Sequence, residues 1–216
     1  MKLQFIEDIE RDIKNWQNSV AVKSYGVDWK KFLPDDISVK KVYNDKYLKN
    51  YLEKKFYRLG KIFEFRNWLE HNVNFIRLQK DLEILVGKKF PSKTIKVFIT
   101  TFHRAPYSFE KSFFYIIWRN SKNREKAITN IYHELMHFLF HWHYWDLCKK
   151  AGLSETQIHV LKESLTVLLN PILKQRELPI DFGYPSHQEI RAKIKEMWRN
   201  AKNFDLILKQ VQKILK

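Results

Sequence analysis

Apolar residues recur every three or four positions through most of residues 1–89, which is the spacing of an amphipathic helix. The first run predicts a helix over residues 3–18. The next begins after Asn44, a good N-cap, and stops at Gly60, a good C-cap. The third runs over residues 62–86 as one long helix or two shorter ones. Residues 1–89 are therefore expected to form a helical N-terminal region.

The pattern changes in the middle of the chain. Residues 94–102 (TIKVFITTF) and 111–119 (KSFFYIIWR) are rich in β-branched and aromatic side chains, so both are predicted to be strands. Pro106 lies between them and favours a hairpin-like or longer connection. Helical spacing then returns in the segments 124–148, 155–169, 187–201 and 204–215. The expected fold class is α+β, mostly helical, with a small β-sheet that precedes the helix of residues 124–148.

Two of the later helices begin with the sequence pattern of a capping box, Ser154 with Gln157 and Ser186 with Glu189. A chain of 216 residues is shorter than the roughly 250–300 residues at which single cores split into domains. Residues 90–216 are therefore expected to form one continuous globule with residues 1–89.

Residues 133–137 read HELMH and carry the clearest chemistry in the chain. His133 and His137 lie four positions apart on a predicted helix, so both imidazoles face the same point and can bind one metal ion. Glu134 stands beside them, where a carboxylate can hold a metal-bound water and take its proton. The neighbouring positions carry no charge, which indicates a buried helix whose polar groups need a partner. A metal ion supplies that partner.

This motif, preceded by two predicted strands, resembles the zincin metallopeptidases over residues 94–184. The resemblance implies a zincin-like fold for the region 90–216, with Zn²⁺ bound by His133 and His137. It also implies hydrolysis of a peptide bond with Glu134 as the general base. The expected partner is therefore a protein or peptide substrate.

A catalytic zinc ion normally has three protein ligands. In the gluzincin branch of the zincins the third ligand is a glutamate from a second helix, and this resemblance makes Glu163 the first choice. His143 completes the histidine spacing of the metzincin branch, but Phe140 stands where that branch has a glycine. His159, one helical turn before Glu163, is an alternative ligand or a donor to one.

Peptide-hydrolysing zincins often add a tyrosine or histidine that stabilises the oxyanion, and the resemblance makes Tyr184 and His187 the candidates. The capping pattern at Ser186 explains the same segment as a helix start. The strand at residues 113–118 is similar to the edge strand along which zincins bind an extended substrate. A fully buried strand fits it equally well.

The formal net charge of +16, from 40 Lys and Arg against 24 Asp and Glu, supports a second hypothesis. A basic surface attracts nucleic acid. The lysines are dispersed in pairs, however, which is also typical of a solvated surface. The alternative function is a basic nucleic-acid-associated protein with a structural or vestigial zincin site.

The composition excludes disordered, collagen-like and disulfide-framework proteins. The single cysteine, Cys148, cannot form an internal disulfide, and no apolar run approaches the roughly 20 residues of a membrane-spanning helix. We therefore expect a cytoplasmic protein with no transmembrane segment.

Two roles stay open for residues 1–89, an inhibitory cover over the cleft or a substrate-docking segment. The sequence indicates neither the oligomeric state nor the cleavage preference.

Overall fold

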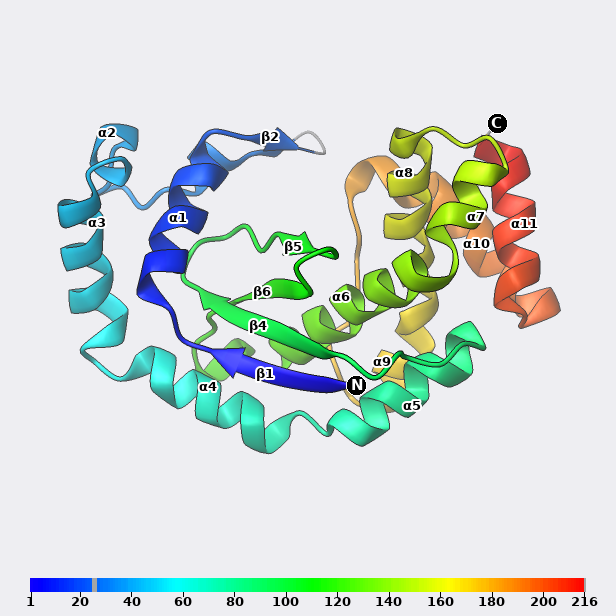
Figure 1. Cartoon of the computed structure of the whole chain (residues 1–216), viewed down its shortest axis with the longest axis horizontal. Coiled ribbons are helices and arrows are strands. Elements are labelled where there is room, and N and C mark those ends of the chain that lie inside the picture. Colours follow the sequence, from blue (N-terminus) through cyan, green and yellow to red (C-terminus); the bar gives the residue numbers. More distant parts are fainter. Residues whose placement is uncertain (25–26, 216) are drawn as a thin grey trace. The chain divides into compact units, whose positions relative to one another are not determined.

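Figure 1 shows a computed structural model of the chain, which describes residues 1–24 and 27–215. The contacts divide the chain into two compact units. The sheet unit consists of Lys2–Val73 and Thr94–Ala127, and the helical unit consists of Met1, Asn74–Lys93 and the chain from Ile128 onward. Each unit therefore takes segments from both sides of the boundary expected at residue 89.

A mixed four-stranded sheet forms the centre of the sheet unit. Its strands are β1 (Lys2–Ile6), β4 (Thr94–Thr100), β5 (Tyr107–Ser108) and β6 (Phe113–Ile117), in the spatial order β1-β4-β6-β5. β4 runs parallel to both β1 and β6, and β5 runs antiparallel to β6. The two predicted strands are confirmed, joined by a longer connection and not by a hairpin. β6 lies between two neighbours, so it is not the free edge strand that the zincin resemblance suggested.

The first strand corrects the helix predicted over residues 3–18. Residues 2–6 form β1, and the helix α1 (Ile9–Val20) begins only after Asp8, whose side chain accepts a hydrogen bond from the Arg11 amide. Leu3 and Ile6 fit a helical period, but they also fit a strand that pairs along β4. The long-range pairing decides between the two, because strand propensity depends strongly on tertiary contacts.

Short helices complete the sheet unit. They are α2 (Val39–Val42), α3 (Asp45–Leu52), a π-helical turn (Glu53–Tyr57), α4 (Lys61–Asn72) and the 3₁₀ turns Trp29–Phe32 and Ser121–Asn123, with β2 (Lys23–Ser24) and β3 (Val27–Asp28) forming a small ribbon. Asn44 caps α3 as predicted, by accepting a hydrogen bond from the Tyr47 amide. The buried core of α1 and α3 includes Trp16, Leu48 and Leu52.

The helical unit contains the remaining helices. They are α5 (Phe75–Val86), most of α6 (Glu125–His143), α7 (Trp145–Lys150), α8 (Glu155–Leu165), α9 (Asn170–Gln175), α10 (Gln188–Ala201) and α11 (Phe204–Leu215), with 3₁₀ turns at Thr166–Leu169 and Pro185–His187. The fold is thus α+β and mostly helical with a small mixed sheet, as the sequence predicts.

One of the two expected capping boxes forms. Ser154 and Gln157 cap α8 reciprocally. At α10 the prediction is wrong, because Pro185 starts a 3₁₀ turn that contains Ser186, and the helix N-cap makes no side-chain hydrogen bond. Glu189 instead pairs with Lys193 one turn later.

No helix within the described residues is long and apolar enough to cross a membrane.

A buried carboxylate joins α1 to the end of β4 within the sheet unit. The side chain of Asp12 is fully buried, and its oxygens accept hydrogen bonds from the Thr101 amide and from the hydroxyls of Thr100, Thr101 and Tyr57. Burial raises the pKa of Asp12 from 3.8 to about 6, although the hydrogen bonds lower it in part.

This raised pKa predicts that the protein loses stability as the pH rises. The folded state holds the Asp12 proton up to about pH 6, whereas the unfolded chain releases it near 3.8. The contribution of Asp12 is therefore complete below the unfolded pKa and is lost as the pH rises through the folded one. A difference of about two pKa units corresponds to about 3 kcal/mol. Between about pH 4 and about pH 7, urea unfolding should show the wild type losing about 2 kcal/mol more than Asp12→Asn, whose amide cannot ionise, because part of the contribution is already lost at pH 4. Equal losses would contradict the prediction.

Candidate metal centre

The α6 helix places the three polar residues of the HELMH motif. His133 and His137 stand one turn apart on the same face, with their ring centroids 4.3 Å apart. His137 is buried, whereas His133 and Glu134 are half-buried. The surrounding positions of the helix, including Leu135, Met136 and Phe138, belong to the core. The burial predicted for this helix is therefore confirmed, and the accessible side of the motif is the side of His133 and Glu134.

The α8 helix brings Glu163 to the two histidines. Its Oε2 lies 3.3 Å from Nε2 of His133, and its Oε1 lies 3.2 Å from Nε2 of His137. One ligand atom from each of these three residues lies within 4.8 Å of the others. The capping box at Ser154 fixes the start of α8, and buried leucines on either side of Glu163 fix its face. Sequence reasoning thus selected three residues that the fold brings together.

Each of these separations is close to the separation of two ligands of a metal ion. With metal–nitrogen and metal–oxygen bonds of about 2.0–2.1 Å, two ligands of a tetrahedral ion lie about 3.3–3.4 Å apart. The distance from Oε2 of Glu163 to His133, 3.3 Å, and the distance from its Oε1 to His137, 3.2 Å, are each close to this spacing. Two histidines and one carboxylate are also the donor types of a catalytic zinc site with one open position. The group can therefore hold a metal ion.

Asp181 contacts His133 at the ring nitrogen that faces away from Glu163. Its Oδ1 lies 3.3 Å from Nδ1 of His133, on the side of the ring away from Glu163. A carboxylate at Nδ1 keeps a proton on that nitrogen, so Nε2 is the nitrogen that gives up its proton when a metal binds. The backbone of Asp181 is fixed in turn by two hydrogen bonds with the side chain of Asn170. This arrangement orients His133 before any metal binds.

Arg191 of α10 connects Asp181 to the helix that carries Glu163. Its side chain is buried and donates to the side-chain and backbone oxygens of Asp181, to the Thr166 hydroxyl and to the carbonyl oxygen of Glu163. Gly183 makes room for it, because a Cβ at Gly183 would lie 2.6 Å from the guanidinium. Gly183 also has a φ of +64°, a backbone conformation that favours glycine. One buried cation thus links the segment of Asp181 to the segment of Glu163.

Lys162 supplies a second buried cation beside the ligand carboxylate. Its side chain is 1% exposed, and its Nζ donates a hydrogen bond of 2.7 Å to Oε1 of Glu163. A buried ammonium group needs an anionic partner, and a buried carboxylate needs donors. Lys162 therefore favours the ionised form of Glu163, which is the form that binds metal.

The electrostatics of the metal-free cluster follow from this arrangement. Burial raises the pKa of Glu163, but the Lys162 ammonium and hydrogen bonds from His133 and His137 outweigh it and hold that pKa well below its usual range. The pKa of Asp181 is also lowered, because His133 and Arg191 outweigh burial. Burial lowers the pKa of His137 to about 3, so this imidazole is neutral, as a metal ligand must be.

The pKa values of His133 and Glu134 are raised, in contrast to those of Glu163, Asp181 and His137. Burial lowers the pKa of His133, but the carboxylates of Asp181 and Glu163 outweigh it and raise this pKa well above its usual value. Burial raises the pKa of Glu134 to about 7. Its Oε2 is buried and accepts no hydrogen bond from any residue in the described part of the chain. Glu134 therefore has a free acceptor next to the metal-binding group.

The other histidines considered as ligands lie outside this group. Nε2 of His143 lies 2.9 Å from the carbonyl oxygen of Lys89, near the end of α6. His159 makes a T-shaped contact with Trp145, and His141 stacks on the same ring. The metal-binding group found in the described residues contains none of the three. The geometry thus favours Glu163 over His143 and His159.

Tyr184 and His187 lie together in the segment that precedes α10. Their ring centroids are 5.5 Å apart in a T-shaped arrangement, and His187 is buried. Burial lowers the pKa of His187, and Glu163 opposes this shift. The oxyanion role of these two residues stays a prediction.

Sequence reasoning missed Asp181, Arg191 and Lys162. Asp181 lies in an irregular stretch with no periodicity, and Arg191 stands on a helix rich in charged residues, where exposure is the usual expectation. A signal existed for Lys162 alone, because it directly precedes Glu163 within an apolar stretch of α8.

Comparisons of the chain with known protein families, with curated proteins and with solved structures found no match.

Proposed function

We propose that the chain is a zinc-dependent peptidase. The observation that carries the proposal is the group of His133, His137 and Glu163, whose ligand atoms lie within 4.8 Å of one another, with Glu134 next to His133 in α6. This donor set leaves one coordination position for water or substrate. The resemblance of the HELMH motif to the zincins supplies the substrate class, a peptide bond.

The proposed mechanism assigns a task to each residue. Zinc held by the three ligands would polarise the substrate carbonyl and lower the pKa of a water molecule. Glu134 accepts the proton of the attacking water and then donates it to the leaving amine. Asp181 keeps Nε2 of His133 directed at the metal. Tyr184 and His187 are proposed to stabilise the oxyanion.

Metal content tests the ligand set directly. Purified wild type should contain about one zinc ion per chain, and His137→Ala and Glu163→Ala should lose it, because two remaining ligands hold zinc poorly. Inductively coupled plasma mass spectrometry after dialysis gives the stoichiometry. His143→Ala is the matched control, because the His143 imidazole contacts the Lys89 carbonyl oxygen and not the ligand group. This variant should retain the zinc.

Two results would contradict this ligand set. A folded, zinc-supplemented wild type without zinc would remove the basis for the peptidase and favour the nucleic-acid alternative. Loss of zinc in His143→Ala, with retention in Glu163→Ala, would move the third ligand to His143. Circular dichroism of each variant separates loss of a ligand from loss of the fold.

A further inference from the structure

A pocket in the sheet unit has no part in the proposed peptidase mechanism. It has a volume of about 260 Å³. Its residues come from α1, α3, the turns at Trp29–Phe32, Glu53–Tyr57 and Ser121–Asn123, the end of β6, and the segments that follow β4 and β6. The lining residues are Trp16, Phe32, Pro34, Tyr51, Phe56, Thr101, His103, Ile117, Trp118, Arg119, Asn120 and Asn123. All of them belong to the sheet unit.

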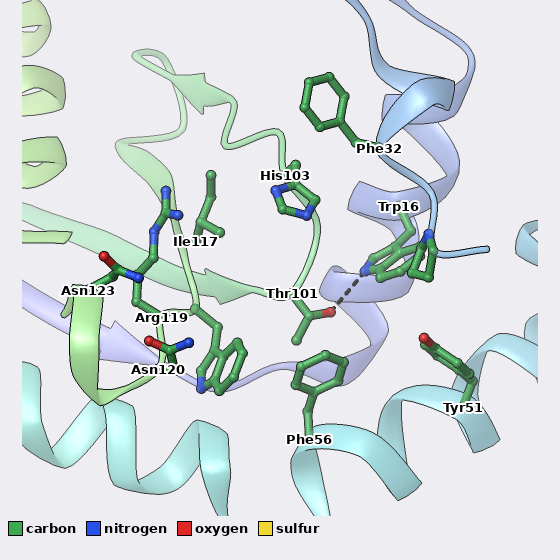
Figure 2. Close-up of a pocket in the computed structure, with 12 residues that line it drawn as sticks. Trp16, Phe32, Tyr51, Phe56, Thr101, His103, Ile117, Arg119, Asn120 and Asn123 are labelled. Atoms are coloured by element: carbon green, nitrogen blue, oxygen red, sulfur yellow. Dashed lines mark hydrogen bonds between the residues drawn. The ribbon is translucent and has the colours of Figure 1, made fainter. Parts of the chain in front are cut away.

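Aromatic rings form much of the wall, and contacts hold several of them in place. Nε1 of Trp16 donates to the Thr101 hydroxyl at 2.9 Å, as Figure 2 shows. Trp118 packs edge-on against Phe56, with ring centroids 5.2 Å apart, and its Nε1 donates to a backbone carbonyl. Rings fixed in this way can stack on a planar ligand with little loss of side-chain entropy.

Three of the polar side chains that line the pocket lie together, whereas Thr101 and His103 lie apart from them. Figure 2 shows Arg119, Asn120 and Asn123 together on one side, facing Trp16 and Phe32 across the space. Asn120 and Asn123 are exposed, and their amides can both donate and accept hydrogen bonds. Hydrogen-bonding side chains therefore face aromatic rings across the pocket.

Arg119 is the charged group among these three side chains, and no acidic residue balances it. Its Nε is buried without a hydrogen-bond partner, and it forms no ion pair with any residue that the structure describes. No Asp or Glu lines the pocket within the same residues. Asp12 lies behind Thr101 and is hydrogen-bonded there. Burial lowers the pKa of Arg119, as expected for a cation removed from water without a counter-ion.

We propose that this pocket binds a small aromatic anion, a planar ring that carries one carboxylate or phosphate group. The guanidinium of Arg119 fits either group, because its planar fork donates two parallel hydrogen bonds. The ring lies between the aromatic side chains, and the amides of Asn120 and Asn123 bind its polar edge. The site is separate from the metal-binding residues, so it is a ligand site in addition to the proposed active site.

Calorimetry with two matched pairs of probes tests the proposal. Adenosine 5′-monophosphate is compared with adenosine, and indole-3-acetate with indole-3-acetamide, using zinc-loaded full-length protein. At least one anion should bind, and its affinity should exceed that of its neutral partner about tenfold or more. The reason is that Arg119 pairs only with the anionic group. The pair that binds shows whether the anionic group is phosphate or carboxylate.

Variants locate the binding. Arg119→Gln should lower the affinity for the anion about tenfold and leave the affinity for the neutral probe unchanged. Arg119→Lys should recover part of the lost affinity. Lys122→Gln is the control, because it removes the same charge from an exposed residue that does not line the pocket. This variant should bind the anion with the wild-type affinity. Failure of both anions to bind, equal affinity for neutral probes, or equal losses in Arg119→Gln and Lys122→Gln would overturn the proposal.

Discussion

Replacing Glu134 with glutamine is expected to slow peptide hydrolysis by orders of magnitude while leaving the zinc content at the wild-type value. The glutamine amide has nearly the same shape as the carboxylate but cannot accept the proton of the attacking water. General acid–base catalysis by a positioned side chain contributes about 10²–10⁴-fold. We therefore expect the cleavage rate to fall by about that factor.

The same substitution should not destabilise the protein. The side chain of Glu134 is removed from water enough for burial to raise its pKa to about 7, and its Oε2 has no hydrogen-bond partner among the described residues. A neutral amide avoids the cost of burying a charge, so thermal unfolding of Glu134→Gln should occur at the wild-type temperature or above it. A lower melting temperature would show that the carboxylate has a structural role.

Mass spectrometry of a peptide library after incubation with zinc-loaded protein measures the cleavage whatever residues flank the cleaved bond. Glu125→Gln is the matched control, because it makes the same chemical change at an exposed position of α6. Cleavage by Glu134→Gln at the wild-type rate would remove Glu134 as general base. A zinc-loaded wild type that cleaves no peptide would contradict the proposed function, even where the ligand set is correct.

The second large effect is expected at Arg191. Arg191→Ala removes a buried cation from four acceptor atoms and leaves the carboxylate of Asp181 without its buried guanidinium partner. Breaking a buried ion pair by removing one partner typically costs about 3–5 kcal/mol. Zinc affinity should also fall about 10–100-fold, because Asp181 then orients His133 less well.

Urea unfolding of the metal-free protein measures the first effect, and zinc titration against a chelator measures the second. Arg199→Ala on the same helix is the control, since Arg199 is exposed and its loss should change stability by less than about 0.5 kcal/mol. If Arg191→Ala matched this control in both measurements, the network around Asp181 would have no energetic role.

The group of His133, His137 and Glu163, which could hold a metal ion, was predictable because its residues lie on regular helices. The spacing of His133 and His137 fixes their common face from sequence alone, and the apolar neighbours of Glu163 indicate its burial. The zincin resemblance added the choice of Glu163. Asp181 was not predictable by the same reasoning, because it reaches His133 from an irregular segment whose path depends on Asn170, Gly183 and Arg191.

The fold was predictable to a similar degree. The strands β4 and β6 and most helices follow from local residue patterns. The strand β1 does not, because its partner β4 lies far along the chain. The helix predicted over residues 124–148 ends at His143, and α7 begins only at Trp145. Tyr144 separates the two helices, and its ring packs against Phe204 of α11. Tertiary contacts of this kind leave no local signature in the sequence.

The position of β1 has a consequence for how the protein is made. Lys2 pairs with Thr94, and Ile6 pairs with Phe98, so the first strand has no partner until the ribosome has added more than ninety residues and released them from its exit tunnel (Figure 1). At about 5–20 residues per second, this interval lasts on the order of 5–20 seconds. An unpaired apolar strand is prone to aggregate during such a delay. Lys2 and Gln4 alternate with the apolar residues of β1, so the nascent strand carries polar groups through the time in which it waits for its neighbour.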